Sequence, residues 1–134
     1  MYLLDTNIII YNLKGNQTVQ ESLQRHRNDS LCVSIISIME LYYGAYKSQR
    51  VESNLEKVKI IEESLKVIQT GEEIAELFGI LKAGLEAKGQ ANDDFDILIA
   101  ATALARILIL VTNITKHFAK IEGLKIDNWS LLEL

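Results

Sequence analysis

Short, mainly apolar runs alternate along this chain with longer segments in which apolar residues recur every three or four positions. The short runs predict buried strands at residues 2–4, 31–33, 67–68, 108–111 and 124–126. The first run stops abruptly at Asp5, and Thr6 and Asn7 open the next segment. In an open α/β sheet, ligands bind at the carboxyl ends of the strands, so Asp5 lies where chemistry is usually done.

Most of the longer segments have the period of an amphipathic helix with a charged outer face. They predict helices over about residues 8–13, 18–27, 38–46, 50–66, 71–88, 97–106 and 115–121, with Thr70 as the cap of the fifth. Because strands alternate with helices, we expect an α/β fold with a parallel sheet of four to five strands, flanked by helices in three α/β/α layers. The 134 residues fit a single domain over positions 1–134.

The composition narrows the class of protein. Hydrophobic residues make up 49% and charged residues 24% of the chain, which is typical of a packed globule. The single Cys32 cannot form an internal disulfide, and neither a signal peptide nor a membrane-spanning run is recognisable, so we expect a cytoplasmic protein. The net charge of −4 argues against holding nucleic acid by charge alone, so any activity on nucleic acid requires a cation.

Three carboxylates, those of Asp5, Glu40 and Asp96, stand at or near the start of a predicted helix. Each has a purely structural explanation. Asp5 and Asp96 are candidate N-caps for the helices that follow them. The segment from Ser37 to Glu40 matches a capping box, in which the glutamate returns to the backbone of the serine.

Taken together, the three acids also predict a metal site. If they meet at one end of the sheet, two carboxylates about 4 Å apart repel each other by roughly 4 kcal/mol at an effective dielectric of about 20. A divalent cation removes this repulsion, and carboxylate oxygens suit Mg²⁺ or Mn²⁺ better than Zn²⁺, for which the chain has no Cys/His cluster. Asp93 and Asp94 either add charge around this site or are ordinary loop acids. His26 and His117 are interpreted as surface or boundary residues.

Five short motifs resemble those of the PIN-domain ribonucleases, and specifically the toxin half of VapBC-type toxin-antitoxin pairs. They are Leu4-Asp5-Thr6-Asn7, the stretch from Ser37 to Gly44, Asp96 to Ala101, Leu110-Val111-Thr112-Asn113 with Phe118, and Gly123-Leu124 with Trp129. No motif is specific by itself, whereas their order and spacing together are. The resemblance covers essentially the whole chain and implies the PIN-like three-layer fold.

The resemblance implies metal-dependent endonucleolytic cleavage of RNA, with Mg²⁺ or Mn²⁺ as the cofactor. The acids that hold the metal in this family, and act in catalysis, correspond to Asp5, Glu40 and Asp96. The small polar residues beside them correspond to Thr6, Asn7 and Thr112.

One position departs from the family pattern. The family commonly has a further Asp or Asn four residues before the phenylalanine of the fourth motif, where this chain has Ile114, with Asn113 just before it. Either Asn113 takes over the outer-sphere contact with the metal, or a second metal position is weaker. We favour the first interpretation because many Mg²⁺ sites use only one or two direct carboxylates.

The resemblance also implies partners. VapC-type toxins pair with a small antitoxin whose peptide arm occupies the groove of the toxin, and they dimerise. We therefore expect an RNA substrate, a cognate antitoxin and a homodimer. Candidates for contacts with RNA phosphates are Lys116, Lys120 and Arg106, which are otherwise ordinary solvated charges.

Two other classes of function fit part of the pattern. A catalytically weak or inactive module of the same fold would bind RNA or a protein without cutting it, and Ile114 motivates this alternative. An aspartyl-phosphate enzyme would also place an acid such as Asp5 at a strand end. The phosphatase version needs a second Asp two positions later, where this chain has Asn7, so it fits less well.

Overall fold

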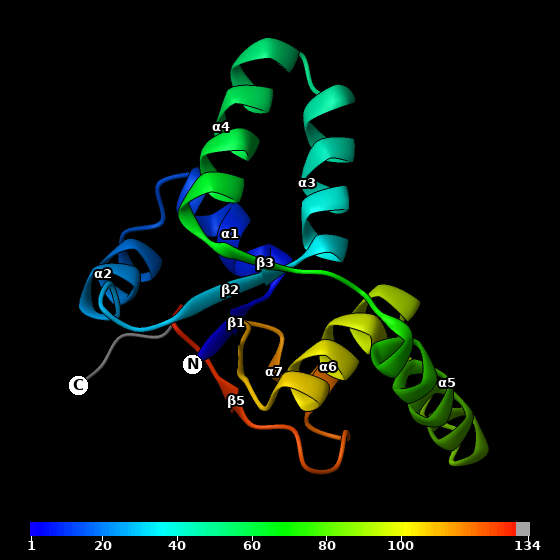
Figure 1. The fold of residues 1–134 in the computed structure, drawn as a ribbon. Helices are drawn as coiled ribbons and strands as arrows, with labels where there is room; N and C mark the ends of the chain where they lie inside the picture. The colour runs from blue at the N-terminus through cyan, green and yellow to red at the C-terminus, as the bar shows by residue number, and fades with distance from the viewer. Residues whose placement is uncertain (131–134) are drawn as a thin grey trace.

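The computed structural model describes residues 1–130, in which strands and helices alternate along the chain (Figure 1). The strands are β1 (Tyr2–Leu4), β2 (Leu31–Ser34), β3 (Lys66–Ile68), β4 (Ile109–Val111) and β5 (Ile126–Asp127). The helices are α1 (Thr6–Leu13), α2 (Gln17–Arg25), α3 (Ile35–Tyr46), α4 (Val51–Ser64), α5 (Glu72–Ala87), α6 (Asp94–Arg106) and α7 (Thr115–Phe118). The predicted α/β class is confirmed.

The strands form one parallel sheet in the order β3-β2-β1-β4-β5, so the first strand of the chain lies at the centre. Leu4 at the end of β1 pairs with Val111 of β4, and the peptide N–H of Asp5 donates to the Val111 carbonyl at 2.9 Å. After β1 the chain continues to β2, which lies on one side of β1 in the sheet. It later enters β4, which lies on the other side of β1. The carboxyl ends of β1 and β4 therefore form a topological switch point, where ligands bind in open α/β sheets.

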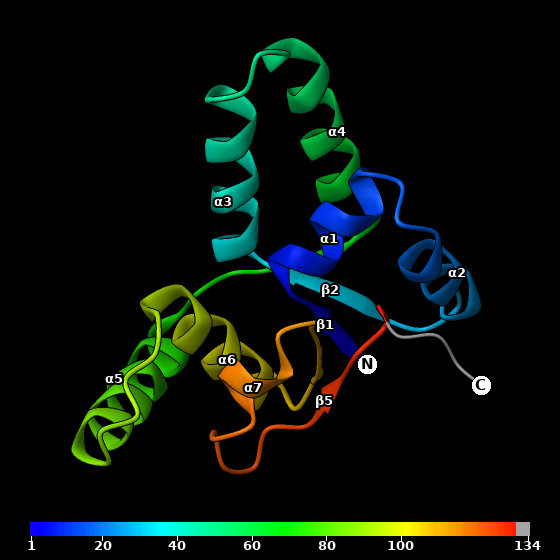
Figure 2. The ribbon, with the colours of Figure 1, turned by 180° about the vertical axis from the view of Figure 1, so that it is seen from behind.

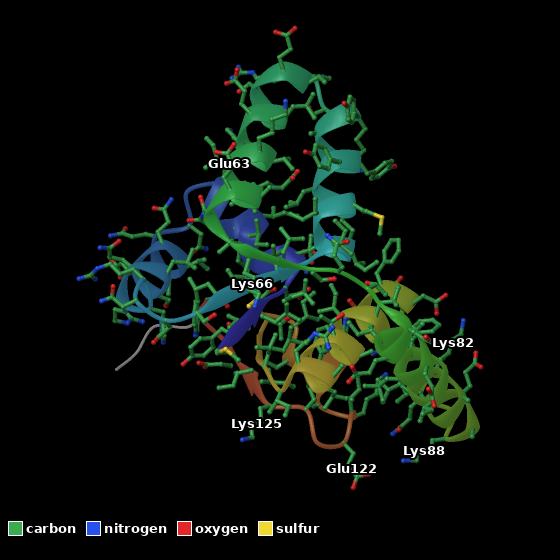
Figure 3. All side chains as sticks on the ribbon, in the orientation of Figure 1. Glu63, Lys66, Lys82, Lys88, Glu122 and Lys125 are labelled. Atoms are coloured by element: carbon green, nitrogen blue, oxygen red, sulfur yellow. The ribbon has the colours of Figure 1, made fainter. Side chains whose placement is uncertain are left out.

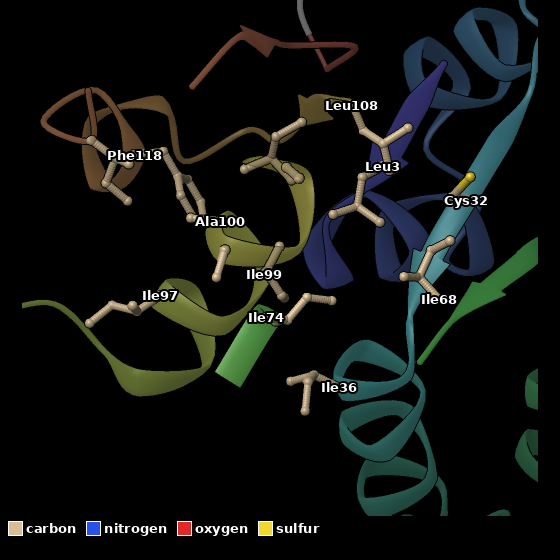
Figure 4. Packing of buried hydrophobic residues seen from close by; sticks show 14 of the residues in the cluster. Leu3, Cys32, Ile36, Ile68, Ile74, Ile97, Ile99, Ala100, Leu108 and Phe118 are labelled. Carbon is tan, nitrogen blue, oxygen red and sulfur yellow. The ribbon is translucent and has the colours of Figure 1, made fainter. Parts of the chain in front are cut away.

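Helices cover both faces of the sheet, as the two opposite views show (Figures 1 and 2). Successive side chains of a strand point to opposite faces, so Leu3 and Leu4 enter different cores. Leu3 packs in a core that contains Ile74 of α5 and Ile97 of α6 (Figure 4). Leu4 packs in a second core with Ile8 of α1 and with residues of α3 and α4. This packing from both faces fixes the end of β1, and with it Asp5.

The helices α3 and α4 form a hairpin that projects beyond the carboxyl edge of the sheet (Figures 1 and 2). Their contact is apolar, with Leu41 and Ala45 of α3 and Val58 and Ile61 of α4 in the same core. Because α3 begins directly after β2, Glu40 in its second turn lies at the same edge of the sheet as the end of β1. None of the helices in the described part of the chain has the length and apolar character that a membrane span needs.

Several predicted elements end at different residues from those expected. The helix predicted over 115–121 ends as α7 at Phe118, and the last strand lies at Ile126–Asp127 and not at 124–126. Gly123 adopts a positive φ of 81°, a conformation that glycine reaches without strain, and the chain turns there. The apolar Leu124 therefore lies before the strand and packs against the core as part of a connection.

The predicted cap of α1 is confirmed, whereas the predicted cap of α3 is wrong. The carboxylate of Asp5 accepts a hydrogen bond from the peptide N–H of Thr6. Helix α3 is capped by Ser34, whose hydroxyl accepts from the second peptide N–H of the helix. Ser37 and Glu40 therefore lie inside α3, and Glu40 has no capping role there.

The predicted caps of α5 and α6 are also wrong. Helix α5 begins after Gly71, without a capping side chain, and Thr70 lies outside it. Helix α6 begins earlier than expected because Asp93 accepts a hydrogen bond from a peptide N–H of the first turn. Asp96 thus lies within the first turn of α6, and its carboxylate is free of the capping role that the sequence suggested.

Candidate active site

Asp5 lies at the centre of the carboxyl edge of the sheet, directly after β1. Its side chain is only 4% exposed. One carboxylate oxygen accepts from the peptide N–H of Thr6 at 2.8 Å, and the other accepts from the hydroxyl of Thr112 at 2.8 Å. Thr112 is fully buried and follows β4, the neighbouring strand. The two central strands thus hold this carboxylate in one orientation.

A chain of hydroxyl groups connects α1 to the carboxylate of Glu40. The Thr6 hydroxyl lies 2.8 Å from the Glu40 carboxylate and 2.8 Å from the Ser37 hydroxyl. Since an ionised carboxylate cannot donate, Thr6 gives its single proton to Glu40, and Ser37 donates to Thr6. Ser37 precedes Glu40 by three residues on the same face of α3, and this spacing is the sequence signal for the pair.

Asp96 brings a third carboxylate from the first turn of α6. Its side chain is 22% exposed, and one oxygen lies 3.3 Å from Nδ1 of His117 in α7. The ring of His117 is half exposed, as expected of a surface or boundary residue, and the contact with this acid adds to that interpretation. Asp96 and His117 are separated by 20 residues, which include most of α6 and the whole of β4. Only the tertiary structure therefore reveals that these two side chains are in contact.

The electrostatics join these acids into one cluster. Burial raises the pKa of Asp5 above its ordinary value of 3.8, and the charge of Asp96 adds to the increase, although the two hydrogen bonds oppose it. Burial also raises the pKa of Glu40, and repulsion by neighbours that include Asp5 and Asp96 adds to this shift. The pKa of Asp96 is raised by burial and then by Asp93, against the opposing effect of His117. Like charges thus disfavour full ionisation of the cluster.

The donor set fits a hard divalent cation. In residues 1–130, no three His, Cys, Asp or Glu side chains converge into a ready-made cage for a metal ion. Mg²⁺ does not require such a cage, because it keeps several waters and is usually held by one or two carboxylates together with substrate phosphates. The carboxylate oxygens of this cluster, which repel one another, therefore suit a partly hydrated Mg²⁺ or Mn²⁺ ion better than a zinc ion in a closed tetrahedral site.

The remaining polar residues of the predicted site lie beside the cluster. Asn7 lines a groove that opens next to Thr6 and Glu40. The amide nitrogen of Asn113 donates to the hydroxyl of Tyr11 at 2.9 Å, and its amide oxygen is buried without a hydrogen-bond partner among the described residues.

Ile114, at the position that departs from the family pattern, contributes only its backbone to this region. Its peptide N–H donates to the Thr112 hydroxyl at 3.1 Å. The hydroxyl that holds Asp5 is therefore itself held by the loop after β4.

The other charged candidates are not all near the cluster. Asp94 forms an ion pair with Lys82 of α5 at 3.0 Å, so its charge is directed toward that helix. Arg106 ends α6 about 15 Å along the axis from Asp96, and it pairs with Glu73 at 3.3 Å. The structure thus separates Arg106 from the three carboxylates.

The other two candidate cations lie on and after α7. Lys116 is exposed beside His117. The ammonium group of Lys120 lies 3.5 Å from the carbonyl of Ala91, in the connection that leads to α6. This connection leads into the first turn of α6, which carries Asp96, so the contact places Lys120 beside the start of that helix.

A groove of about 980 Å³ opens beside the acids, between α1, α3 and α4. Thr6 and Glu40 line it next to the cluster, and α3 leads from there to Lys47. Apolar side chains such as Ile10 and Val58 form part of its wall. Of the three acids, Glu40 therefore borders a space that is large enough for a ligand much larger than a metal ion.

Comparison with known sequences gives matches over nearly the whole chain. The sequence profile of the PIN domain matches residues 2–124. Ribonuclease VapC2 of Haemophilus influenzae is 37% identical over 128 residues, which cover 96% of this chain and 97% of the relative. The tRNA(fMet)-specific endonuclease VapC of Shigella flexneri is 34% identical over 129 residues, which cover 96% of this chain and 98% of the relative.

Comparison with solved structures gives a similar result. A chain in the crystal structure of VapBC2 from Rickettsia felis, bound to a DNA fragment from their promoter, superposes with a TM-score of 0.89. The two chains are 34% identical, and the match covers 96% of this chain and 98% of the other. The similarity therefore includes both layers of helices and the central sheet.

Proposed function

The chain belongs to the PIN-domain family, and from this membership we propose that it is a metal-dependent endoribonuclease, the toxin of a toxin-antitoxin pair. One observation carries the proposal. Carboxylates from three distant segments, Asp5, Glu40 and Asp96, are partly or fully desolvated; the charge of Asp96 raises the pKa of Asp5, and the charges of Asp5 and Asp96 raise the pKa of Glu40. Repulsion within such a cluster of like charges lowers the stability of the fold unless a bound cation offsets the charges. The ribonuclease and endonuclease names of the two curated relatives support the same activity.

The proposed chemistry is hydrolysis of an RNA phosphodiester bond. When bound, Mg²⁺ or Mn²⁺ supplies an activated water and offsets negative charge on the phosphate. Asp5 and Asp96 offer the oxygens that hold the ion, and Asp5 keeps its orientation through the Thr112 hydroxyl. Glu40, oriented by its hydrogen bond from Thr6, holds the ion or orients the attacking water.

Asn113 is the proposed outer-sphere contact in place of the further acid of the family. Its buried amide oxygen lacks a hydrogen-bond partner among residues 1–130, which supports a role for this atom. Lys116 and Lys120, which follow the same loop, remain proposed contacts for RNA phosphates.

Substitution of the proposed ligands tests the nuclease. We expect Asp5→Asn and Asp96→Asn to abolish Mg²⁺-stimulated RNA cleavage, while the metal-free protein stays as stable as the wild type or becomes more stable, because a repelling charge is removed. Asp94→Asn is the matched control, since this acid lies two residues from Asp96 and pairs with Lys82. Full cleavage by both site variants refutes the metal site, and loss of fold in both favours a purely structural role.

The second candidate function is a module of the same fold that binds RNA or a protein without cutting it. Two observations favour it: Ile114 replaces the usual polar residue, and the described acids form no ready-made metal cage. Purified protein decides between the two. Metal-stimulated cleavage that is lost in Glu40→Gln supports the enzyme, whereas binding without turnover supports the module.

We also propose that the chain pairs with an antitoxin and forms a homodimer. The similar chain of Rickettsia felis was crystallised as part of VapBC2, which supports a protein partner for this one. Co-expression with the product of a short neighbouring gene tests the pairing by co-purification. Light scattering of the purified chain tests the dimer, and a monomer mass at all concentrations contradicts it.

A further inference from the structure

Each carboxylate of the acidic cluster is held by a side-chain donor from another segment. Asp5 accepts from a hydroxyl of the loop after β4, and Glu40 accepts from a hydroxyl of α1. For Asp96 the corresponding group is the ring of His117 in α7, whose Nδ1 lies 3.3 Å from one carboxylate oxygen. His117 is therefore the third member of a set of donors whose other two members orient proposed ligands.

The neighbouring acids of α6 have partners of their own. Asp93 accepts from a peptide N–H of the first turn at 2.9 Å. Asp94 pairs at 3.0 Å with Lys82, which Figure 3 shows on α5. Among residues 1–130, no hydrogen-bond donor other than His117 pairs with the Asp96 carboxylate. The orientation of this acid therefore depends on one contact.

The backbone around His117 is fixed. Its peptide N–H donates at 3.0 Å to the carbonyl of the residue that caps α7, and its own carbonyl accepts from the side-chain amide of Asn92 at 2.7 Å. Phe118, the next residue, is fully buried in the same core as Ile97, which directly follows Asp96 (Figure 4). Because the core already holds both backbones, the contact between the two side chains costs little additional ordering.

The proton of this contact belongs to the ring. An ionised carboxylate only accepts, so Nδ1 carries the hydrogen, and a neutral ring of this tautomer donates as a charged ring does. Burial and the charge of Asp93 raise the pKa of Asp96, and the contact with His117 opposes both. The ring occupies one oxygen of Asp96 and leaves the other without a donor among residues 1–130. In metal sites, a ligating carboxylate is commonly held in this way by a residue that does not itself bind the metal.

We propose that His117 is a positioning residue, which holds one oxygen of Asp96 and keeps the other available to the divalent cation. The inference rests on the proposed metal-dependent cleavage and adds a residue that acts through Asp96, without touching the ion or the RNA. The described acids form no closed cage, so the orientation of each one contributes to metal affinity. Loss of such a positioning contact costs about 10- to 100-fold in metal affinity.

Two substitutions of His117 form a matched pair. His117→Leu and His117→Asn both replace the ring by a side chain that branches at Cγ, but only asparagine has a donor nitrogen on Cγ, as the ring has at Nδ1. The Kd for Mn²⁺ is measured on the full chain without RNA, from the electron paramagnetic resonance signal of free Mn²⁺. We expect His117→Leu to raise this Kd by about 10- to 100-fold and His117→Asn to restore most of the affinity.

Lys82→Leu is the control for the Mn²⁺ measurement. It removes the partner of Asp94, an acid in the same first turn of α6, and should leave the Kd for Mn²⁺ close to the wild-type value. Urea unfolding of each metal-free variant shows whether the fold is retained. If His117→Leu does not fold, His117→Ala takes its place in the comparison with His117→Asn.

The Mg²⁺ dependence of RNA cleavage separates positioning from a direct role in the reaction. A residue that acts only through a metal ligand changes how much Mg²⁺ is needed. We therefore expect His117→Leu to raise the Mg²⁺ concentration at half-maximal rate by about 10- to 100-fold, with a rate at saturating Mg²⁺ close to that of the wild type. A residue that contacts RNA or the reacting atoms lowers the rate at saturating Mg²⁺ as well.

Three results overturn this inference: an unchanged Kd for Mn²⁺ in His117→Leu, equal weakening in His117→Leu and His117→Asn, or a low rate of His117→Leu at saturating Mg²⁺. The proposed nuclease is judged separately, by Mg²⁺-stimulated cleavage of RNA by the wild-type chain. Wild-type cleavage together with unchanged metal affinity in His117→Leu refutes the inference and leaves the nuclease standing. A wild-type chain that neither binds Mn²⁺ nor cleaves RNA refutes both.

Discussion

The hydroxyl of Thr112 holds the Asp5 carboxylate, and Thr112→Val removes it with little change of shape. In the wild type this fully buried hydroxyl donates to the 4% exposed carboxylate of Asp5 at 2.8 Å. It also accepts from the peptide N–H of Ile114 at 3.1 Å. The variant therefore leaves a buried charge with one donor fewer and a backbone N–H without its acceptor.

The cost follows from these two losses. A hydrogen bond to a charged group contributes about 1.5–3 kcal/mol, and the unpaired N–H adds about 1 kcal/mol because water reaches this partly buried loop, so we expect a loss of roughly 2–4 kcal/mol at neutral pH. When Asp5 is protonated, the lost bond is between neutral groups, and the total cost falls to roughly 1–2 kcal/mol.

The pH dependence has a definite sign. The Thr112 hydrogen bond lowers the pKa of Asp5, so its removal raises this pKa further above 3.8. A carboxyl group whose pKa is raised in the folded state loses stability as pH rises through that pKa. The free energy of unfolding of metal-free Thr112→Val should therefore fall further below the wild-type value at a pH of about 8 than at about 4.5.

Urea unfolding of the metal-free protein at the two pH values measures this difference. Thr102→Val is the matched control, because the fully buried Thr102 hydroxyl donates to the neutral carbonyl of Leu98 within α6. We expect it to cost at most about 1 kcal/mol at both pH values. Equal losses for the two variants, or a Thr112→Val loss that does not change with pH, would show that the hydroxyl does not hold a charged Asp5.

Two further expectations concern stability. Ile107, the C-cap of α6, is 88% exposed and has φ 56° and ψ 52°, a left-handed conformation that strains a residue other than glycine. Ile107→Gly should therefore raise the free energy of unfolding by about 1 kcal/mol in urea denaturation, and a decrease would contradict this strain. Because the pKa values of Asp5, Glu40 and Asp96 are raised, the melting temperature of the metal-free protein should fall as pH rises from about 4, and Mg²⁺ should restore it at a pH of about 8 but hardly at about 4.5. An equal Mg²⁺ effect at both pH values, or in Asp5→Asn, would be inconsistent with binding by these carboxylates.

The local sequence pattern was sufficient to find the strands and helices, but it misassigned several of the residues that cap the starts of the helices. Ser37 and Glu40 have the spacing of a capping box, yet the Glu40 carboxylate accepts from Thr6, 34 residues earlier. A capping rule considers only neighbours in sequence, whereas a buried carboxylate binds the best donor that the fold provides. The same limit explains why His117 was not linked to Asp96.

The surface charges show the same limit for long-range pairs. Arg106 was a candidate for contacting RNA phosphates, but it pairs with Glu73 of α5. The cations that line the groove, such as Lys47 and Lys57, belong to the hairpin of α3 and α4. Their common location depends on how two helices pack, and periodicity alone does not specify which helices are neighbours.

The sequence by itself determined the order of strands and helices, the burial of β1, and the position of Asp5 where that strand ends. These features follow from short-range rules, because a run of apolar residues must be covered and a polar residue ends it. Only the tertiary structure decided that Glu40 and Asp96 approach Asp5, since this depends on the strand order β3-β2-β1-β4-β5. That order brings the ends of β1 and β2 to one edge, where Asp5 and helix α3 with Glu40 follow them, and the charges of Asp5 and Asp96 both raise the pKa of Glu40 there.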